Sequence, residues 1–347
     1  MIAQSYREEV FEEIKGQGCV TLRVISAECE FPSMASPVIQ APHERMVELL
    51  YRLAPHEGYT QSLLDGVRFL RSNRPLKHTP VLYEPSIVIV CQGRKRGYLG
   101  DEVYLYDAQH YLVLSVPLPF SSETEASPEE PMLAMAIRLD MAVVADLVLI
   151  LDQSSGHSIG APRGMISTPL GEPMADATLR LLDALTSPID ARILAPAIVR
   201  EICYRVLIGE QGGSVRAALA HQGQFGRIAK ALRRIHADYA ETLEVARLAG
   251  EVGMSAPAFH VHFKAVTRTS PIQYIKSTRL HHARLMMVRD GLTAAAAAAQ
   301  VGYESPSQFS REFKRFFGRP PGEEVREMKS TLALLPPTQV AGLAQPH

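Results

Sequence analysis

Hydrophobic residues recur with two different periods along the chain, and the change of period separates a strand-rich half from a helical half. From about residue 60 to residue 140, short apolar runs such as 86–91, 111–116 and 132–139 are separated by Gly and Asp at hairpin spacing. No helical pattern interrupts these runs. The sequence therefore predicts a small antiparallel barrel or sandwich rather than alternating strands and helices.

Helical spacing flanks the strand-rich segment. A short helical pattern covers 44–53, and longer ones cover 141–151, 174–185 and 191–208. Between them, 154–171 is typical of turns, and the Gly-rich cluster 209–213 is predicted to link two domains. The apolar stripes of the last two helical patterns include Leu181, Leu182, Leu185, Ile198, Ile202 and Val206.

One segment of the helical half occurs twice, 50 residues apart. Each copy starts with a serine in an N-cap position, continues as a helical pattern and stops at a proline. A further helical pattern precedes each copy, ends at Gly253 or Gly302, and carries a small residue, Ala249 or Ala298, which allows two helices to approach closely. Each copy therefore predicts a helix-turn-helix unit. The aligned pairs include Ser255 and Ser305, Phe259 and Phe309, Phe263 and Phe313, Lys264 and Lys314, and Pro271 and Pro321.

The second helix of each unit has an aromatic face and a more polar face at about 100° per residue. Phe259, Phe263 and Val266 share the first aromatic face, and Phe309, Phe313 and Phe316 share the second; all are assigned to the core. The opposite faces would meet DNA if these helices enter the major groove. Those candidate DNA-facing residues are Pro257, His260, Val261, Lys264, Ser307, Gln308, Ser310, Arg311, Lys314 and Arg315.

Individual roles follow from side-chain chemistry. Arg311 can bind a guanine through two hydrogen bonds, and Gln308 can bind an adenine. Lys264, Lys314 and Arg315 are predicted to contact phosphate, since most hydrogen bonds in such interfaces go to the DNA backbone. A single exposed Arg or Gln also contacts phosphate or solvent more often than a base, so this alternative stays open for Arg311 and Gln308.

Two further helical patterns complete the helical half. Residues 227–239 are amphipathic, and 272–289 form one long pattern that ends at Gly291 and joins the two units. A rigid connecting helix would fix the separation of the two reading helices, which must be about 34 Å for successive major grooves on one face of a duplex.

Charge is distributed unevenly over the 347 residues. The whole chain has a formal net charge of −1, yet residues 225–329 hold 17 Lys and Arg against 10 Asp and Glu, a net charge of +7. The remainder holds 19 Lys and Arg against 27 Asp and Glu, a net charge of −8. This asymmetry favours a polyanionic partner for the C-terminal part alone.

Residues 225–328 resemble the DNA-binding domain of the AraC/XylS family of bacterial transcription regulators. The resemblance rests on 302–305 (GYES), 309–315 (FSREFKR) and 317–321 (FGRPP), with support from 270–274 (SPIQY) and 279–284 (RLHHAR). The strand-rich half, through 84–86 (EPS) and 90–95 (VCQGRK), is similar to the subgroup with a cupin-like sensor domain.

The resemblance implies an α+β protein of two domains. They are a cupin-like sensor and dimerisation domain over 43–210 and a double helix-turn-helix domain over 225–329, with a poorly specified arm at 1–42, including a possible strand at 20–25, and a flexible tail at 330–347. It further implies a sequence-specific regulator, more often an activator, that forms a homodimer through helices within 174–208. Double-stranded promoter DNA, a small-molecule effector and RNA polymerase would be its partners in the bacterial cytoplasm. Candidate effector-binding residues inside the barrel are Cys91, Tyr98, Tyr104 and Tyr111, although tyrosines at such positions can equally be strand core.

The first unit departs from the family pattern in two ways. Arg268 stands where the family usually ends the first reading helix with Gly, as Gly318 does in the second unit. A left-handed cap is costly for Arg, so either the helix end is altered or the side chain reaches phosphate. Pro257, His260 and Val261 also make the first face rather apolar, which favours thymine methyl groups and DNA shape as its targets.

Two other function classes remain as alternatives: a cupin-type enzyme with an appended DNA-binding domain, and a non-specific architectural DNA-binding protein. A cupin metal site needs clustered histidines on strands, whereas those of the sensor half are isolated, so we expect no metal, no cofactor and no enzyme activity. The charge of +7 and the regular spacing argue against an architectural protein. No apolar run reaches membrane-spanning length, no export signal is evident, and four scattered cysteines are expected to be reduced.

Overall fold

The computed structural model describes residues 42–152, 162–209, 212–219 and 223–329. The predicted strand at 20–25, all but the last residue of the arm, and the predicted tail at 330–347 lie outside these ranges. The described residues belong to one compact unit that begins at Ala41. None of the helices within the described ranges is long and apolar enough to cross a membrane.

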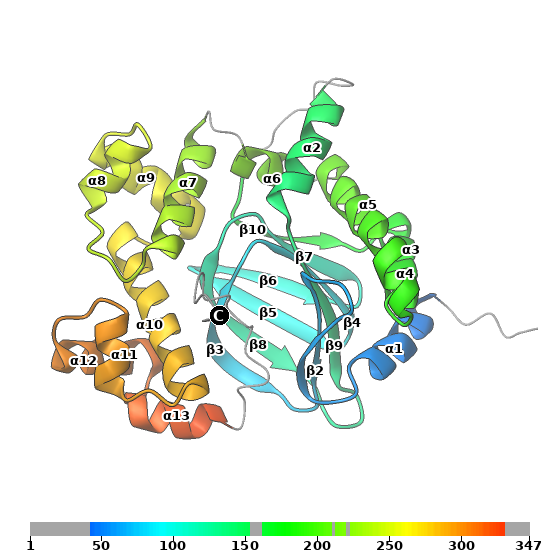
Figure 1. The fold of residues 1–347 in the computed structure, drawn as a ribbon, viewed down its shortest axis with the longest axis horizontal. Coiled ribbons are helices and arrows are strands. Elements are labelled where there is room, and N and C mark those ends of the chain that lie inside the picture. Colours follow the sequence, from blue (N-terminus) through cyan, green and yellow to red (C-terminus); the bar gives the residue numbers. More distant parts are fainter. Residues whose placement is uncertain (1–41, 153–161, 210–211, 220–222, 330–347) are drawn as a thin grey trace, which may run out of the picture. The chain divides into compact units, whose positions relative to one another are not determined.

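The strand-rich half forms two antiparallel sheets (Figure 1). The six-stranded sheet has the order β1-β2-β9-β4-β7-β10, and the four-stranded sheet has the order β3-β8-β5-β6. The strands are β1 Gly58–Gln61, β2 Val67–Ser72, β3 Leu76–Tyr83, β4 Ser86–Gln92, β5 Arg94–Leu99, β6 Glu102–Asp107, β7 His110–Leu114, β8 Leu118–Glu125, β9 Met132–Arg138 and β10 Met165–Pro169.

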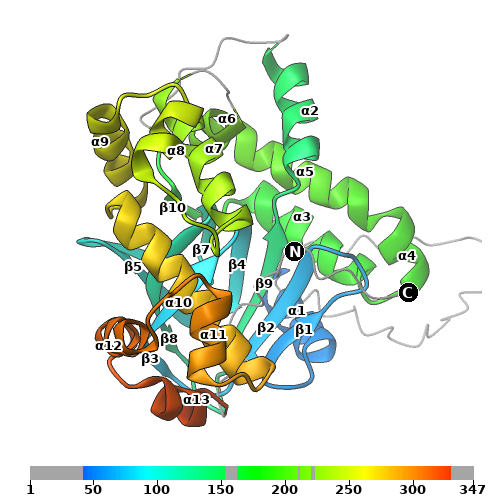
Figure 2. The same ribbon diagram turned by 60° about the vertical axis from the view of Figure 1, so that its left-hand side comes forward.

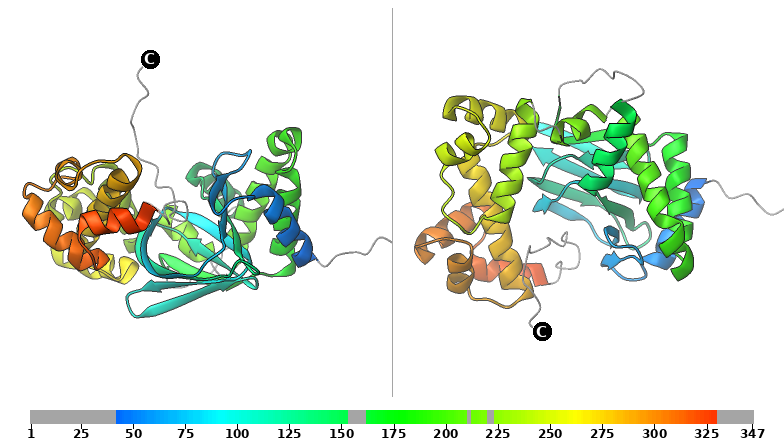
Figure 3. Two further views of the ribbon diagram at one scale, coloured as in Figure 1. Left: turned by 90° about the horizontal axis from the view of Figure 1, so that it is seen from below. Right: turned by 45° about the horizontal axis from the view of Figure 1, so that its top comes forward.

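Successive residues of the six-stranded sheet point to opposite faces and enter different cores. In β4, Ile87 and Ile89 pack with helical residues, whereas Val88 and Val90 pack with residues of the four-stranded sheet. Helices α1 Pro42–Leu53, α3 Glu172–Ala184 and α5 Ala195–Ile208 cover the outer face (Figure 3). The inner core therefore lies between the two sheets, and the outer core lies between one sheet and its helices.

Three local predictions need correction. The turn-rich segment 154–171 contains β10, an edge strand that pairs with β7; its Ser, Thr and Pro conceal the strand pattern. The helical pattern 191–208 is broken at Leu194, so that α4 Pro188–Ile193 precedes α5. Helix α6, Gly212–Leu219, begins inside the predicted linker 209–213. There the chain turns so tightly that a Cβ on Gly212 would lie 1.8 Å from the Leu207 carbonyl oxygen.

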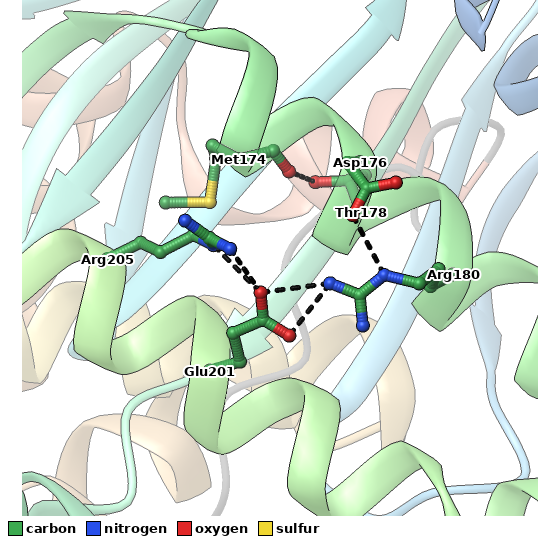
Figure 4. Close-up of polar contacts among 6 residues, drawn as sticks. All are labelled: Met174, Asp176, Thr178, Arg180, Glu201 and Arg205. Carbon is green, nitrogen blue, oxygen red and sulfur yellow. Dashed lines mark hydrogen bonds and ion pairs between the residues drawn. The ribbon is translucent and has the colours of Figure 1, made fainter.

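Ion pairs join α3 to α5 (Figure 4). The Glu201 carboxylate accepts hydrogen bonds from Arg180 at 2.7 Å and from the Arg205 Nε at 2.9 Å. These hydrogen bonds, that of Arg180 first, lower the pKa of Glu201. Arg180 also contacts Asp176 one turn away on its own helix. The network fixes the two helices against each other within one chain.

The C-terminal half is helical. Helix α2, Met141–Asp152, confirms the pattern predicted after the last long strand. The remaining helices are α7 Gln224–Ala237, α8 Val245–Glu251, α9 Ala256–Thr267, α10 Pro271–Arg289, α11 Ala294–Gln300, α12 Pro306–Phe317 and α13 Pro321–Lys329. The α8–α9 pair lies at one end of α10 and the α11–α12 pair at the other (Figures 1 and 2). The predicted α+β class, with two helix-turn-helix units joined by a long helix, is confirmed.

Candidate nucleic-acid interface

Each reading helix is anchored by buried phenylalanines. Phe259 and Phe263 of α9, and Phe309 and Phe313 of α12, have no exposed surface. The core assignment of Phe316 was wrong, because this side chain is 36% exposed. Its neighbour Phe317 is only 9% exposed and packs under α10, with its ring centroid 5.5 Å from that of His281 and 4.4 Å from the Arg284 guanidinium carbon.

Both reading helices start at a serine cap, as predicted. The Ser255 hydroxyl accepts a hydrogen bond from the Ala258 amide, and the Ser305 hydroxyl accepts one from the Gln308 amide. The turn before the second helix requires glycine for two reasons: Gly302 has a φ of +79°, and a Cβ there would lie 2.2 Å from the Ala240 carbonyl oxygen.

The faces opposite the phenylalanines are open to solvent. Of the ten candidate DNA-facing residues, all are exposed except Ser310, which is half-buried. Val261 is 67% exposed, which agrees with a first face of apolar character. Within the described part of the chain, the four Lys and Arg side chains among these candidates form no ion pair and are available to an anionic partner. They are Lys264, Arg311, Lys314 and Arg315.

A carboxylate that the sequence analysis did not single out positions the second reading helix. Glu312 accepts hydrogen bonds from Lys276 of α10 at 2.7 Å and from the Tyr303 hydroxyl at 2.8 Å. Gln308 donates to the same carboxylate at 3.2 Å. Partial burial opposes ionisation, but these three donors together lower the pKa of Glu312. The second N–H and the carbonyl oxygen of the Gln308 amide are left for another partner.

Arg268 ends the first reading helix in the left-handed conformation that the family usually fills with Gly. Its φ of +57° is the only positive φ of a non-glycine residue in the described ranges. Its guanidinium pairs with Glu102, which follows the β5–β6 turn, and Tyr104 also donates to that carboxylate. Gly100 permits the approach, because a Cβ on it would lie 3.1 Å from the Arg268 Cβ. The cap is therefore retained, and Arg268 contacts the sheet domain.

Helix α10 makes two further contacts with the sheet domain. The Tyr274 hydroxyl donates to the Pro117 carbonyl oxygen at 2.7 Å, so the His236 Nε2, also at 2.7 Å, must donate to that hydroxyl. Arg284 is 2% exposed and donates to the Pro80 carbonyl oxygen at 2.6 Å and to Glu324 of α13 at 3.3 Å. Burial lowers the pKa of Arg284 to about 10, although Glu324 opposes the shift.

Three histidines of the helical half, His236, His281 and His282, are held neutral at physiological pH by burial. Burial lowers the pKa of His236 to about 3 and that of His282 to about 4, and it lowers the pKa of His281 as well. The His282 ring stacks on Tyr239 at 3.9 Å. No group of three or more potential metal ligands occurs within the described ranges. These histidines therefore serve packing.

The four candidate effector residues lie on different faces of the sheets. Cys91 and Tyr111 belong to the outer core beneath the helices, and burial raises the pKa of the Cys91 thiol to about 12. Tyr98 lies on the outer face of the four-stranded sheet and donates to Glu123 at 2.7 Å. Only Tyr104 faces the inner core. Alternation along the strands separates them, so they do not line one pocket.

Two families match this chain. Residues 63–214 match the family described as AraC-type transcriptional regulator N-terminus, and residues 248–327 match the family described as helix-turn-helix domain. The first covers strands β2 to β10 and helices α2 to α5, and the second covers both reading helices.

Several relatives match part of the chain. A Streptomyces lividans protein named as an AraC-like transcription regulator is 35% identical over 96 residues, which are 28% of this chain and 32% of that protein. A Streptomyces antibioticus protein of the same name is 28% identical over 46% of this chain and 55% of its own length. The RCS-specific HTH-type transcriptional activator RclR of Escherichia coli is 38% identical over 26% of this chain and 31% of its length. The chain thus spans between about a third and just over half of these relatives.

Two solved structures of ToxT from Vibrio cholerae share the fold. One, bound to an unsaturated fatty acid, covers 78% of this chain and 97% of its own, with a TM-score of 0.51 and 12% identity. Another, bound to (E)-4-(8-methylnaphthalen-1-yl)but-3-enoic acid, covers 74% of this chain and 98% of its own, with a TM-score of 0.52 and 12% identity. At this identity the likeness establishes the fold alone.

Proposed function

The chain belongs to the AraC-type transcriptional regulators, and on this premise we propose that it binds specific promoter DNA under the control of a small-molecule effector. The observation that carries the proposal is the pair of capped helices, α9 and α12, which expose polar or cationic side chains opposite a phenylalanine core. Both flank α10, and residues 225–329 have a net charge of +7. Such a surface suits the polyanionic major groove.

We assign base recognition mainly to α12. Arg311 is exposed and unpaired within the described ranges, so its planar guanidinium is available to the O6 and N7 of a guanine. Gln308 donates one N–H to Glu312 and offers its second N–H and its carbonyl oxygen to an adenine. Lys264, Lys314 and Arg315 serve as phosphate contacts. In α9, Pro257, His260 and Val261 contact thymine methyl groups and respond to groove shape.

The first unit is the one through which the sensor acts. Its buried residues, including Phe259 and Phe263, belong to the same hydrophobic cluster as the inner faces of the sheets. The second unit has a separate core around Phe309 and Phe313. The Glu102–Arg268 pair and the Tyr274–Pro117 hydrogen bond tie the sheets to the first unit. Effector binding would change the population of this tied arrangement and so the presentation of α9 to DNA.

Dimerisation requires a different surface from the predicted stripe. Leu181, Leu182 and Ile202 are fully buried in the chain's own outer core, so they cannot meet a second copy. Helix α4 instead exposes Ile189 and Ile193, each 68% exposed. The α3–α5 ion pairs join helices of one chain and leave the exposed apolar face of α4 open. We propose that this face, with Ile189 and Ile193, forms a homodimer contact.

The remaining assignments rest on the family premise. We propose that the protein acts on DNA in the bacterial cytoplasm, without catalysis, and that it activates transcription through RNA polymerase. The relative RclR is named a transcriptional activator.

Arg311→Ala should weaken binding to a DNA site selected from a random pool by about fivefold or more, because the loss of a bidentate base contact costs ~1–3 kcal/mol. Binding to random DNA should change much less. Fluorescence anisotropy with both duplexes measures the two affinities. Lys314→Ala is the control and should weaken both duplexes alike, with the salt dependence reduced by about one unit of slope. Equal losses for Arg311→Ala on both duplexes would reduce Arg311 to a phosphate contact and favour a non-specific architectural protein.

Glu102→Gln should strengthen binding of the effector-free protein to the selected site by up to about fivefold, since exposed ion pairs contribute ~0.2–1 kcal/mol. The reason is that loss of the pair releases Arg268 and the first unit from the sheet domain. Glu123→Gln is the matched control, because Glu123 contacts Tyr98 and Arg96 within the sheet. Weaker binding by Glu102→Gln, or no difference between the two variants, would show that the pair does not restrain the first unit.

Ile193→Asp should convert a dimer to a monomer in sedimentation equilibrium. Because Ile193 is exposed, its thermal midpoint should fall only by the concentration-dependent stabilisation that the dimer provides. Leu182→Asp should instead reduce the free energy of unfolding by about 3 kcal/mol or more, because it places an unpaired charge in the outer core. A dimer mass for Ile193→Asp, or a monomer mass for the wild-type protein, would remove α4 from the proposed contact.

A further inference from the structure

One arginine in the middle of α10 contacts both helix-turn-helix units. The Arg279 guanidinium donates hydrogen bonds to the carbonyl oxygens of Tyr239 at 2.7 Å and Glu241 at 2.6 Å. It also donates to the carbonyl oxygen of Gly302 at 3.1 Å. Tyr239 and Glu241 lie in the connection that leads into α8 of the first unit, whereas Gly302 lies in the turn between α11 and α12. A single side chain therefore joins the first unit to the second.

The chemistry of the guanidinium makes this a contact of fixed geometry. Each of the three Arg279 nitrogen atoms donates to a different carbonyl oxygen, and Arg279 forms no ion pair with a residue of the described ranges. Burial lowers the pKa of Arg279. A guanidinium is planar and presents its N–H groups in fixed directions. The three carbonyl oxygens must therefore keep their relative positions for all three hydrogen bonds to form.

The turn of the second unit also packs directly on the first unit. A Cβ on Gly302 would lie 2.2 Å from the Ala240 carbonyl oxygen and 3.3 Å from the Arg279 Nη2. Gly253 occupies the corresponding turn of the first unit, and a Cβ there would have no atom of this kind within 4 Å. The two turns thus differ: the second is enclosed by the segment before α8, and the first is open.

The side chain of Tyr239 strengthens the connection between the units. It is partly buried against the core of the second unit, around Phe309 and Phe313. Its ring stacks on His282 of α10, with centroids 3.9 Å apart and planes 4° from parallel. The segment that precedes α8 is therefore held against the second unit by its side chain as well as by its carbonyl oxygens.

We propose that Arg279 is a positioning residue that fixes the orientation of α12 relative to α9, so that the two units read DNA as one rigid body. The length of α10 sets how far apart the units lie, and Arg279 sets how the second unit is turned relative to the first. The inference rests on the proposed function, since α9 and α12 would be the reading helices. Arg279 acts through the backbone of both units and contacts no DNA itself.

A rigid reader accepts one spacing between the two DNA segments that it contacts. One base pair inserted between these segments moves the second by about 3.4 Å along the duplex and rotates it by about 35°. A protein whose units can turn relative to each other follows this displacement, whereas a rigid protein loses one of its two contacts. The effect of an insertion on affinity therefore reports on orientation. Loss of stability alone would weaken binding to both duplexes by the same factor.

Fluorescence anisotropy with the selected site and with the same site carrying one inserted base pair tests the proposal. The insertion should weaken binding of the wild-type protein by about tenfold or more, because avidity is lost when both contacts cannot form together. Arg279→Ala should bind the unmodified site about tenfold more weakly than the wild-type protein, yet the insertion should weaken its binding by no more than about threefold. Equal effects of the insertion on the two proteins would overturn the proposal.

Arg227→Ala is the matched control. Arg227 of α7 donates to the Gly253 carbonyl oxygen at 3.0 Å, which is a hydrogen bond to the turn within the first unit alone. This variant should keep the full effect of the insertion. A reduced effect in Arg227→Ala would show that any loosened turn relaxes the spacing, and it would contradict the specific role of Arg279.

Arg279→Lys keeps the positive charge and the apolar stem, so it tests the geometry of the contact in a variant that is expected to fold. One ammonium group cannot replace a planar fork that spans three carbonyl oxygens. Arg279→Lys should therefore show the same reduced effect of the insertion as Arg279→Ala. Wild-type behaviour in this variant would show that charge alone is sufficient, which the proposal does not allow.

A distance measurement without DNA separates this inference from the proposed function. Spin labels are attached through an unnatural amino acid at Ala265 of α9 and Ser307 of α12, both exposed. Pulsed electron paramagnetic resonance of the full chain should give one narrow distance distribution in the wild-type background and a broader one with Arg279→Lys. Equal widths would overturn the positioning role. The expected widths in a protein that binds no specific DNA would retain that role and remove the proposed function.

Discussion

Helix α10 is buried along most of its length, with 13 of its 19 residues inside the molecule. At 1.5 Å per residue it spans about 28 Å, which is close to the spacing of successive major grooves. Its first turn packs against Phe263 through Tyr274, and its later turns pack against Phe317 through His281 and Arg284. A mobile connection could not hold the two reading helices, α9 and α12, at a fixed separation. The spacing of the two helix-turn-helix units therefore depends on the burial of α10.

The burial of α10 removes polar and charged side chains from water, and hydrogen-bond partners offset the free energy that this costs. Arg284 is held by the carboxylate of Glu324 and by the carbonyl oxygen of Pro80, and its face covers the Phe317 ring. His281 and His282 avoid the cost by staying neutral. Arg284 and Tyr274 also contact the sheet domain, so the helix that spaces the two units is in direct contact with that domain.

The two helix-turn-helix units differ in the contacts that hold their reading helices. The second has a glycine cap at Gly318, a carboxylate at Glu312 that fixes its helix, and its own core. The first has an arginine cap in a conformation that costs ~1–2 kcal/mol for a residue with a side chain, and that residue pairs with the sheet domain. A glycine at position 268 would relieve the backbone but could make no such pair. The first helix-turn-helix unit is therefore suited to regulation by the sheet domain, and the second is suited to base recognition.

Much of this could be predicted from the sequence, because the repeat places caps, turns and phenylalanines at fixed offsets. The helix-turn-helix units, the connecting helix and the strand-rich half followed from periodicity and from Ser255 and Ser305. Helical periodicity did not identify which of Phe316 and Phe317 is buried. Phe317 is buried because it packs against His281 and Arg284 of α10, a contact that periodicity does not reveal.

Contacts between residues far apart in the sequence also could not be predicted from it. The departure at Arg268 was visible in the sequence, but its partner Glu102 lies 166 positions away. Cys91 and Tyr111 were predicted to line a pocket because alternation alone does not reveal which face of a strand the helices cover.

Hydroxyl-radical footprinting of the wild-type protein on a DNA site selected from a random pool tests the central claim most directly. The account predicts two protected stretches on one face of the duplex, with centres about 10–10.5 base pairs apart, as expected for two helices in successive major grooves. A single protected stretch, or uniform protection without sequence preference, would contradict a regulator with two reading heads spaced by α10.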